Sequence, residues 1–566
     1  MRRADPNQTT ADRSARPQTA RPQVTRPSGP VAHADALTLE LEAMRDRVQA
    51  LEQEVALLKK VRQAQTQRLE AIARSTSWRI TRPLRLLIRV AKRQTTFGDI
   101  GHHLGLVFAR RRGVGPGGAK PPGPPPTPQA DPIRLEALSF PLPGAIAHLP
   151  ELTGAAPEPL LATVSVVIPT FNAGAEFYWL LRKLKAQKGL GGIEIVVVDS
   201  GSSDGTAELA ESFGCTLVRI PNSEFSHSHA RNLGADKARG DLLLFTVQDA
   251  YPAGDHWLHS LAVALTRPTA NGDRLAAVSC TEFPRRDSEI VYNAGIEAHY
   301  AFLGCRDADR VGVLSGQDHQ SLRTQGQLSD VACMITASMF QAYRYEGRYA
   351  EDLILGVRLI RDGHRIAMLS SVRVIHSHNR PASYHLRRTF VDVLFLTDAF
   401  VDFSLPPASS IGGALAAADA LHTVIAAWSP QPGANAAESL RQLSLRLRRI
   451  PLRGLRAAQG LDFGVAALGP WIAAAVAAEG HPGGSDAHQV RTMCVDRIEG
   501  LADHVERVYG EVDDYLVGEL KAAVDKTLAS TLGAQLAFYY LNHALADEPG
   551  DQQRLAALRT LMLAGI

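Results

Sequence analysis

The chain has 566 residues, of which 45% are hydrophobic and 21% are charged. At about 100–200 residues per domain, this length predicts three or four structural units with enough apolar material for large cores. The net charge of only +3 argues against a nucleic-acid-binding role, and the five cysteines form no CxxC pair, which argues against a zinc ribbon or a thioredoxin-like site.

The cysteines are odd in number and widely spaced, as is typical of reduced thiols in a cytoplasm. No apolar stretch follows the basic N-terminus, so we do not expect a secretory signal. The most apolar later stretch, residues 463–478, is shorter than the roughly 18 residues of a membrane span and is rich in Ala and Gly. We therefore expect a cytoplasmic protein and interpret this stretch as a buried helix; a membrane-inserted helix is the alternative.

The N-terminal part of the chain divides into segments of different composition. Residues 1–36 are rich in Pro, Arg, Thr and Gln, which predicts a disordered basic tail. Residues 37–74 repeat apolar side chains at alternating spacings of four and three, which predicts a short coiled coil and a parallel homodimer. The seam consists of Leu37, Leu41, Met44, Val48, Leu51, Val55 and Leu58. An amphipathic helix packed against its own chain is the alternative interpretation.

Residues 75–111 interleave Trp78 and several aliphatic side chains with arginine and lysine. This mixture suits an anionic membrane surface, so peripheral contact with the inner face of the cell membrane is one interpretation. A solvated basic helix face is the other. Residues 112–140 are dominated by Pro and Gly and predict a semi-rigid linker without a core.

Residues 160–400 alternate between short apolar runs and helical patterns. This order predicts an α/β domain with a mostly parallel, Rossmann-like sheet that has helices on both faces. The predicted strands are 164–168, 193–198, 216–220 and 242–247, and the predicted helices are 176–187, 204–213 and 229–238. Residues 405–566 are alanine-rich and predict a C-terminal helical accessory domain, with helices at 414–428, 436–449 and 490–508.

Polar side chains gather where three of the predicted strands end. The first strand ends in Pro169, Thr170 and Asn172, the second in Asp199, Ser202 and Asp204, and the fourth in Gln248 and Asp249. Ligands of open parallel sheets bind at the carboxyl ends of the strands, so we expect one polar rim that binds a nucleotide and, through a cation, its diphosphate. Asp204 is also a good helix-cap and turn residue, so a structural role is the alternative for that loop.

Four motifs occur in one order: VSVVIPTFN at 164–172, VVVDSGSSDGT at 196–206, ARNLGADKARGD at 230–241 and QDA at 248–250. Together they resemble the nucleotide-binding half of family 2 glycosyltransferases, which have the GT-A fold. Two later motifs, EDLILGVRLIRDG at 351–363 and VIHSHN at 374–379, resemble the acidic acceptor-side motif and the histidine motif of that family. The resemblance implies an inverting enzyme that moves a sugar from a nucleotide-sugar donor to a hydroxyl.

The resemblance also implies a metal site. The Asp-X-Asp motif of the family is present as Gln248-Asp249-Ala250, with one carboxylate only. Asp249 is therefore the expected direct ligand of a divalent ion, Mg²⁺ or Mn²⁺, that neutralises the leaving diphosphate. His376 is the expected second ligand, and His378 joins it because residues two apart on a strand share a face. A surface or packing role for the two histidines is the alternative.

By the same resemblance, Asp352 is the expected general base that takes the proton of the acceptor hydroxyl. Glu351 is expected to orient the acceptor. The alternative is that the two carboxylates open a helix, where they favour the helix dipole. Both descriptions can hold at once.

The segments FSHSHARNLG at 225–234 and TVQDAYP at 246–252 resemble the bacterial rhamnosyltransferase branch of the family. This implies dTDP-L-rhamnose as donor, although another UDP- or GDP-sugar stays open. Arg231 is expected to face the diphosphate, with an ordinary helix-surface position as its alternative, and His227 and His229 are candidate sugar or phosphate contacts. The GlnXXArgTrp motif of processive polymerases is absent, so we expect one or a few sugars to be added to a cell-surface polysaccharide or a lipid-linked glycan.

Two other functions are alternatives to glycosyl transfer. A dinucleotide- or NTP-binding enzyme is disfavoured because no GxGxxG follows the first strand and no GxxxxGK[ST] occurs. A non-catalytic coiled-coil scaffold with a degenerate transferase domain stays open because the metal motif has a single carboxylate.

Overall fold

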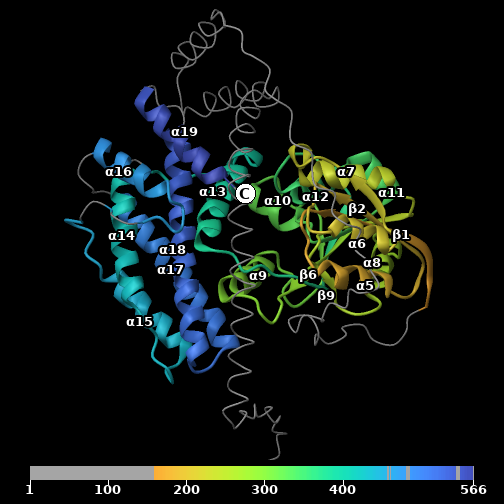
Figure 1. The fold of residues 1–566 in the computed structure, drawn as a ribbon, viewed down its shortest axis with the longest axis horizontal. Helices are drawn as coiled ribbons and strands as arrows, with labels where there is room; N and C mark the ends of the chain where they lie inside the picture. Colours follow the sequence, from red (N-terminus) through yellow and green to blue (C-terminus); the bar gives the residue numbers. More distant parts are fainter. Residues whose placement is uncertain are drawn as a thin grey trace, which may run out of the picture. The chain divides into compact units, whose positions relative to one another are not determined.

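The computed structural model describes residues 158–564 except 270, 409, 456–457, 459–460, 480–484 and 544–548, and the described part of the chain belongs to one compact unit. Figure 1 labels many of its helices and some of its strands. The tail, coiled coil, basic segment and linker predicted for residues 1–140 lie outside the described residues, as do the dimer contact and the membrane contact that depend on them.

Four parallel strands form the half of the sheet that the sequence predicts. They are β1 (Leu160–Thr170), β2 (Leu190–Asp199), β3 (Thr216–Arg219) and β4 (Leu242–Thr246). Their order is β3-β2-β1-β4, and each adjacent pair is parallel. The register places buried Pro169 opposite Val198 and Thr170 opposite Asp199, so the polar ends of β1 and β2 lie side by side.

The other half of the sheet is mixed, a feature that the sequence does not reveal. β8 (Ala332–Thr336) runs antiparallel to β4 and to β6 (Leu275–Phe283), and β9 (Arg365–Ile375) runs parallel to β6. The short strands β5 (Tyr251–Pro252) and β7 (Arg310–Gly312) pair antiparallel with β9. After β4, consecutive strands are no longer neighbours in the sheet, so the simple strand–helix–strand rule for parallel pairing stops applying.

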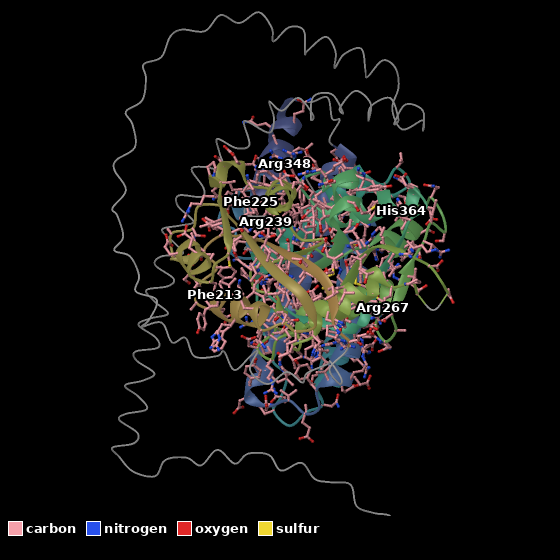
Figure 2. The ribbon with its side chains drawn as sticks, turned by 90° about the vertical axis from the view of Figure 1, so that its right-hand side faces the viewer. Phe213, Phe225, Arg239, Arg267, Arg348 and His364 are labelled. Atoms are coloured by element: carbon pink, nitrogen blue, oxygen red, sulfur yellow. The ribbon has the colours of Figure 1, made fainter. Side chains whose placement is uncertain are left out.

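Helices cover both faces of the sheet, as predicted. One face carries α5 (Phe177–Lys185), α6 (Thr206–Ser212) and α8 (Trp257–Thr266), and the other carries α7 (His227–Lys237), α10 (His319–Gly326), α11 (Ala337–Tyr343) and α12 (Glu351–Arg361). Because successive strand residues point to opposite faces, Val166 of β1 joins the first core and Val167 joins the second. On the first face Phe213, labelled in Figure 2, meets Tyr178 edge-on with ring centroids 5.5 Å apart.

A further core lies among the C-terminal helices, and it confirms the predicted helical region. These helices are α14 (Ile411–Ala427), α15 (Ala436–Arg448), α16 (Leu468–Glu479), α17 (Ser485–Val508), α18 (Asp514–His543) and α19 (Pro549–Leu563). The same core takes in Ile290 of α9 (Ile290–Phe302) and Phe390 of α13 (Ala382–Ala399), so it recruits segments that precede residue 405. α16 buries Trp471 and Ile472 in it, and no helix in the described ranges is both long and apolar enough to cross a bilayer.

The backbones of α13 and α18 come unusually close at one glycine. A Cβ atom added to Gly533 would lie only 2.1 Å from the carbonyl oxygen of Leu386. Any larger residue at this position must push the two helices apart, so Gly533 is what permits α18 to lie directly against α13. This contact fixes α13, the helix that follows the histidine motif.

Candidate active site

Three potential metal ligands meet beyond the carboxyl end of β4. Asp249 lies between β4 and β5, and β5 pairs with β9 through Tyr251 and Ile375, the residue before His376. His376 Nε2 lies 3.6 Å from Asp249 Oδ1 and 3.1 Å from His378 Nε2, and His378 Nδ1 lies 3.6 Å from Asp249 Oδ2. One ligand atom from each of the three residues lies within 4.8 Å of the other two. This set, called the metal cluster below, can hold one cation, although both histidines follow β9 and do not lie on the strand.

A carboxylate behind His376 orients its ring. Glu282 of β6 places Oε2 2.6 Å from His376 Nδ1, while Nε2 of the same ring is directed at Asp249. The hydroxyls of Tyr292 and Tyr300 donate to Glu282 at 2.7 and 3.2 Å. A proton on Nδ1 directs the lone pair of Nε2 into the metal cluster, which is the usual arrangement of a metal-binding histidine and its carboxylate partner. Glu282 could not be recognised from the sequence, because a lone acidic residue in an apolar strand carries no motif.

The pKa values of the two imidazoles are shifted in opposite directions. Burial alone would lower the pKa of His376, but hydrogen bonds to the carboxylates of Asp249 and Glu282 raise it to about 10. Burial and the charge of His376 lower the pKa of His378 to about 4. Burial would raise the pKa of Asp249, yet the hydrogen bond and charge of His376 bring it below its ordinary value. At neutral pH the metal cluster thus contains an ionised carboxylate and a neutral imidazole. A cation held there would compete with the proton of His376.

The loop after β2 is built around Asp199, which is 2% exposed. Its Oδ1 accepts hydrogen bonds from the hydroxyls of Thr170, at 3.1 Å, and Ser202. Its Oδ2 accepts from the backbone N–H groups of Gly201 and Ser202 at 3.1 and 3.0 Å. Ser202 Oγ in turn accepts from the N–H of Asn172 at 2.9 Å. These bonds tie the ends of β1 and β2 into one rim.

Asp204 and Gln248 bind backbone groups of the same rim. Asp204 accepts from the N–H of Gly174 at 2.9 Å and from the hydroxyl of Thr206 at 2.6 Å. The Gln248 amide pairs with both backbone groups of Phe171, at 2.9 and 3.3 Å. The two contacts of Asp204 fit the structural role that is the alternative interpretation of this residue. Because Gln248 precedes Asp249, its bonds also attach the metal cluster to the loop after β1.

Asp352 lies in the first turn of α12 and is 7% exposed. Its Oδ2 accepts a hydrogen bond from Gln327 Nε2 at 3.0 Å. Burial, and then the charges of Asp330 and Glu351, raise the pKa of Asp352 well above its ordinary value. A carboxylate with a raised pKa is suited to accept a proton near neutral pH. Its place in the first turn also fits the helix-opening role.

Arg231 lies where neither interpretation of the sequence placed it. Its side chain is fully buried, its Nη1 donates to Glu351, and its Nη2 donates to the carbonyl oxygen of Asp330 at 2.7 Å. The guanidinium also lies 5.6 Å from the ring centroid of Tyr345. This burial contradicts both the surface position and the position facing the diphosphate. It also means that the carboxylate of Glu351, expected to orient the acceptor, is engaged by Arg231.

Three further polar residues lie at the start of α7 and just before β8. His227 and His229 stand exposed in the first turn of α7, which Ser226 caps by accepting from the N–H of His229 at 3.1 Å. Asp330 lies in the turn before β8, and no motif in the sequence marks it. Burial would raise the pKa of Asp330, but the charges of Arg231 and of His376 lower it. The charge of Asp330 is in turn one cause of the raised pKa of Asp352.

Residues 165–324 match the family model described as glycosyl transferase family 2. This part of the chain is a family 2 glycosyltransferase domain. The mixed sheet of the glycosyltransferase domain, with helices on both faces, is a GT-A fold. The motifs around Asp199 and Asp249 lie inside the matched range, whereas Asp352 and the histidines lie beyond it.

Two curated relatives place the glycosyltransferase domain in the rhamnosyltransferase-like branch of the family. The O-antigen chain rhamnosyltransferase RfbN of Salmonella typhimurium is 25% identical over 240 residues, which cover 40% of this chain and 70% of RfbN. The O-antigen chain rhamnosyltransferase WbaN of Salmonella anatum is 25% identical over 239 residues, which cover 41% of this chain and 71% of WbaN. Among solved structures, the mannosyltransferase PcManGT from Pyrobaculum calidifontis, in complex with GDP-Man and Mn²⁺, matches with a TM-score of 0.34 and 18% identity, over 62% of this chain and 89% of that chain.

Proposed function

We propose that the glycosyltransferase transfers L-rhamnose from dTDP-L-rhamnose to a hydroxyl of a cell-surface polysaccharide or a lipid-linked glycan, with inversion at the anomeric carbon. The observation that carries the proposal is the convergence of Asp249 with His376 and His378, from two distant parts of the chain, beside the rim that ends β1. The rhamnosyl donor is supported by the names of the two Salmonella relatives and by the motif resemblance. Another UDP- or GDP-sugar is the alternative donor.

The residues of the metal cluster fit a divalent ion, Mn²⁺ or Mg²⁺. One carboxylate and two imidazoles form a mixed oxygen and nitrogen donor set, which first-row divalent ions accept. When bound, such an ion supplies a Lewis acid that stabilises the negative charge of the leaving diphosphate. Gln248 stands where the Asp-X-Asp motif has a carboxylate, and its amide is bonded to Phe171. The second imidazole would supply the ligand that this carboxylate provides.

Asp352 is the proposed general base. It accepts the proton of the acceptor hydroxyl while that oxygen bonds to the anomeric carbon and the bond from this carbon to the diphosphate breaks, the electron pair leaving with the nucleoside diphosphate. Its raised pKa supports this role, since the proton that it accepts is held more firmly than by an ordinary carboxylate. The buried pair of Arg231 and Glu351 holds the first turn of α12, and with it Asp352, against α7.

A donor screen tests the proposal. The full chain is incubated with Mn²⁺ or Mg²⁺ and a panel of dTDP-, UDP- and GDP-sugars, and released nucleoside diphosphate is measured. We expect slow, metal-dependent hydrolysis of dTDP-L-rhamnose above that of the other donors. Preference for another sugar would refute the rhamnosyl assignment. Inertness toward every donor would favour the non-catalytic scaffold.

Calorimetry of nucleotide binding tests the metal cluster separately. Asp249→Ala should abolish metal-dependent binding of dTDP, because it removes the only carboxylate of the metal cluster. The matched control is Asp255→Ala, which removes a partly exposed ion pair with Lys188 and should bind as the wild type does. Unchanged binding in Asp249→Ala would place the metal elsewhere.

A further inference from the structure

A buried carboxylate makes one of the contacts between the C-terminal helices and the earlier part of the chain. Glu289, directly before α9, has a side chain that is 7% exposed. It accepts a hydrogen bond from Lys526 of α18, and its Oε1 lies 3.2 Å from His385 Nε2 of α13. Burial would raise the pKa of Glu289, but the bonds with His385 and Lys526 hold it below its ordinary value, so the ion pair is charged at neutral pH.

Glu289 also contacts residues 376–380, which we call the histidine segment. The N–H of Arg380 donates to Glu289 Oε1 at 3.4 Å, and the N–H of Glu289 donates to Asn379 Oδ1 at 2.9 Å. Arg380 Nη2 lies 3.4 Å from His378 Nδ1. Consecutive contacts therefore connect Lys526 of the C-terminal helices with His378 of the metal cluster.

Helix packing fixes the other end of the histidine segment. α13 starts at Ala382, immediately after Pro381, and its backbone touches α18 at Gly533. The segment is thus held between β9 on one side and α13 on the other. α18 packs against α13 and, through Lys526, binds Glu289. One helix therefore supports the histidine segment at two points.

We propose that Lys526 is a positioning residue for the metal cluster: by holding Glu289, it keeps the histidine segment where His376 and His378 face Asp249. This inference rests on the proposed metal-dependent transfer, because it assigns the C-terminal helices a part in forming that site. The helical region is then a component of the active site, and a glycosyltransferase domain cut off at residue 400 lacks a properly formed metal cluster.

The test compares Lys526→Met with Lys526→Arg in the full chain. Methionine keeps the apolar stem and removes the charge, whereas arginine keeps the charge. We expect Lys526→Met to lower the affinity for Mn²⁺ by up to about 10-fold, the lower end of the loss for a direct partner of a metal ligand, because Lys526 acts through Glu289. We also expect faster hydrogen exchange at the amides of residues 376–385, measured without metal. Lys526→Arg should restore both properties.

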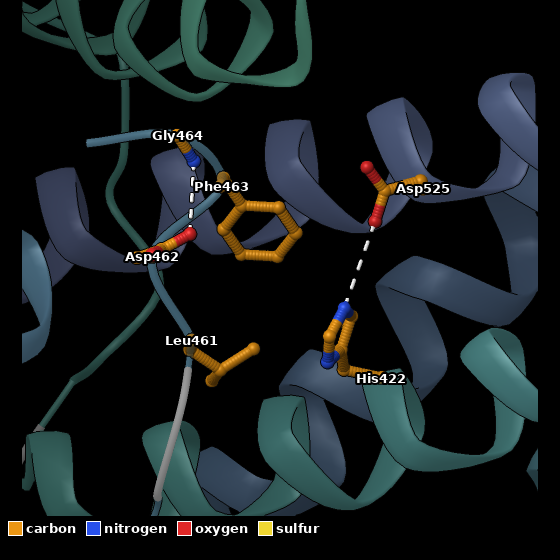
Figure 3. A pocket seen from close by; sticks show the side chains of 6 residues that line it. All are labelled: His422, Leu461, Asp462, Phe463, Gly464 and Asp525. Atoms are coloured by element: carbon orange, nitrogen blue, oxygen red, sulfur yellow. Dashed lines mark hydrogen bonds and ion pairs between the residues drawn. The ribbon is translucent and has the colours of Figure 1, made fainter. Parts of the chain in front are cut away.

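The neighbouring residue Asp525 provides the matched control. It lines a separate cavity of about 250 Å³ together with His422 and Phe463, and Figure 3 shows its carboxylate directed at His422. The two groups are 3.9 Å apart and partly exposed, so this is a weak ion pair. Asp525→Asn changes the same turn of α18 without touching Glu289. It should leave the Mn²⁺ affinity and the exchange of residues 376–385 unchanged.

The outcomes separate this inference from the proposed function. Unchanged exchange and unchanged Mn²⁺ affinity in a folded Lys526→Met variant would overturn the inference. If Lys526→Met does not fold, Glu289→Gln/Lys526→Met removes both charges and is measured in the same way. A wild-type chain that fails to bind Mn²⁺ would overturn the proposed metal-dependent function, and the exchange data would still decide whether Lys526 holds the histidine segment.

Discussion

Arg231 of α7 and Glu351 of α12 form an ion pair inside the protein although 120 residues separate them in the chain. Their side chains are 0% and 5% exposed. The pair joins α7, which carries the motif at 230–241, to α12, which carries the acidic motif at 351–363. Because Glu351 is followed by Asp352, the pair also sets the position of the proposed base.

Removing one charge of this pair should lower the free energy of unfolding. Arg231→Met leaves the Glu351 carboxylate buried without its cation, and we expect a loss of about 3–5 kcal/mol in the free energy of unfolding. Urea denaturation at pH 7 measures the loss. The double variant Arg231→Met/Glu351→Gln removes both charges and should recover much of it. A single variant that loses less than about 1 kcal/mol would mean that the pair does not stabilise the helix contact.

Asp352→Asn should separate chemistry from donor binding. Without a base, the rate of transfer should fall about 10²- to 10⁴-fold, while the dissociation constant of the donor measured by calorimetry should stay the same. Asp362→Asn, at the exposed far end of α12, is the control and should keep full activity. Equal losses of donor affinity and of rate in Asp352→Asn would assign this carboxylate to donor binding.

The raised pKa of Asp352 also fixes a pH dependence. Only the ionised form accepts a proton, so the wild-type rate should rise as the pH rises through the raised pKa. The folded state favours protonated Asp352, whereas the unfolded chain releases that proton near the ordinary carboxyl pKa of about 4. Wild-type stability from this group is therefore lost as the pH rises above that value. Asp352→Asn should become progressively more stable than the wild type over the same range.

Glu282→Gln tests the support behind the metal cluster. The neutral amide still accepts a hydrogen bond from His376 Nδ1 but no longer strengthens the imidazole as a ligand. We expect the affinity for Mn²⁺, measured by calorimetry, to fall about 10- to 100-fold. Tyr292→Phe removes one donor to Glu282 and should have a smaller effect. The same Mn²⁺ affinity in Glu282→Gln and in the wild type would show that the ring of His376 needs no carboxylate partner.

The sequence predicts the parallel half of the sheet because each strand there is a continuous apolar run that a helix separates from the next. The convergence of Asp249 with His376 was also predictable, since both belong to recognisable motifs. The partner of Arg231 was not, because nothing local in the helix of residues 227–237 reveals a carboxylate 120 residues away. The pairing of Glu289 with Lys526 could not be predicted for the same reason. Each is an ordinary charged residue in the sequence, and only tertiary packing buries the two together.

The last prediction concerns the close contact between α13 and α18. Gly533→Ala places a Cβ atom 2.1 Å from the carbonyl oxygen of Leu386, so the helices must separate, and we expect a loss of about 1–3 kcal/mol. Gly518→Ala in the same helix is the matched control, because no atom lies within 4 Å of its added Cβ. Alanine favours a helix over glycine, so Gly518→Ala should gain about 0.5–1 kcal/mol. Thermal and urea unfolding of both variants measure the difference, and equal stability of the two would show that α13 and α18 have room to adjust at Gly533.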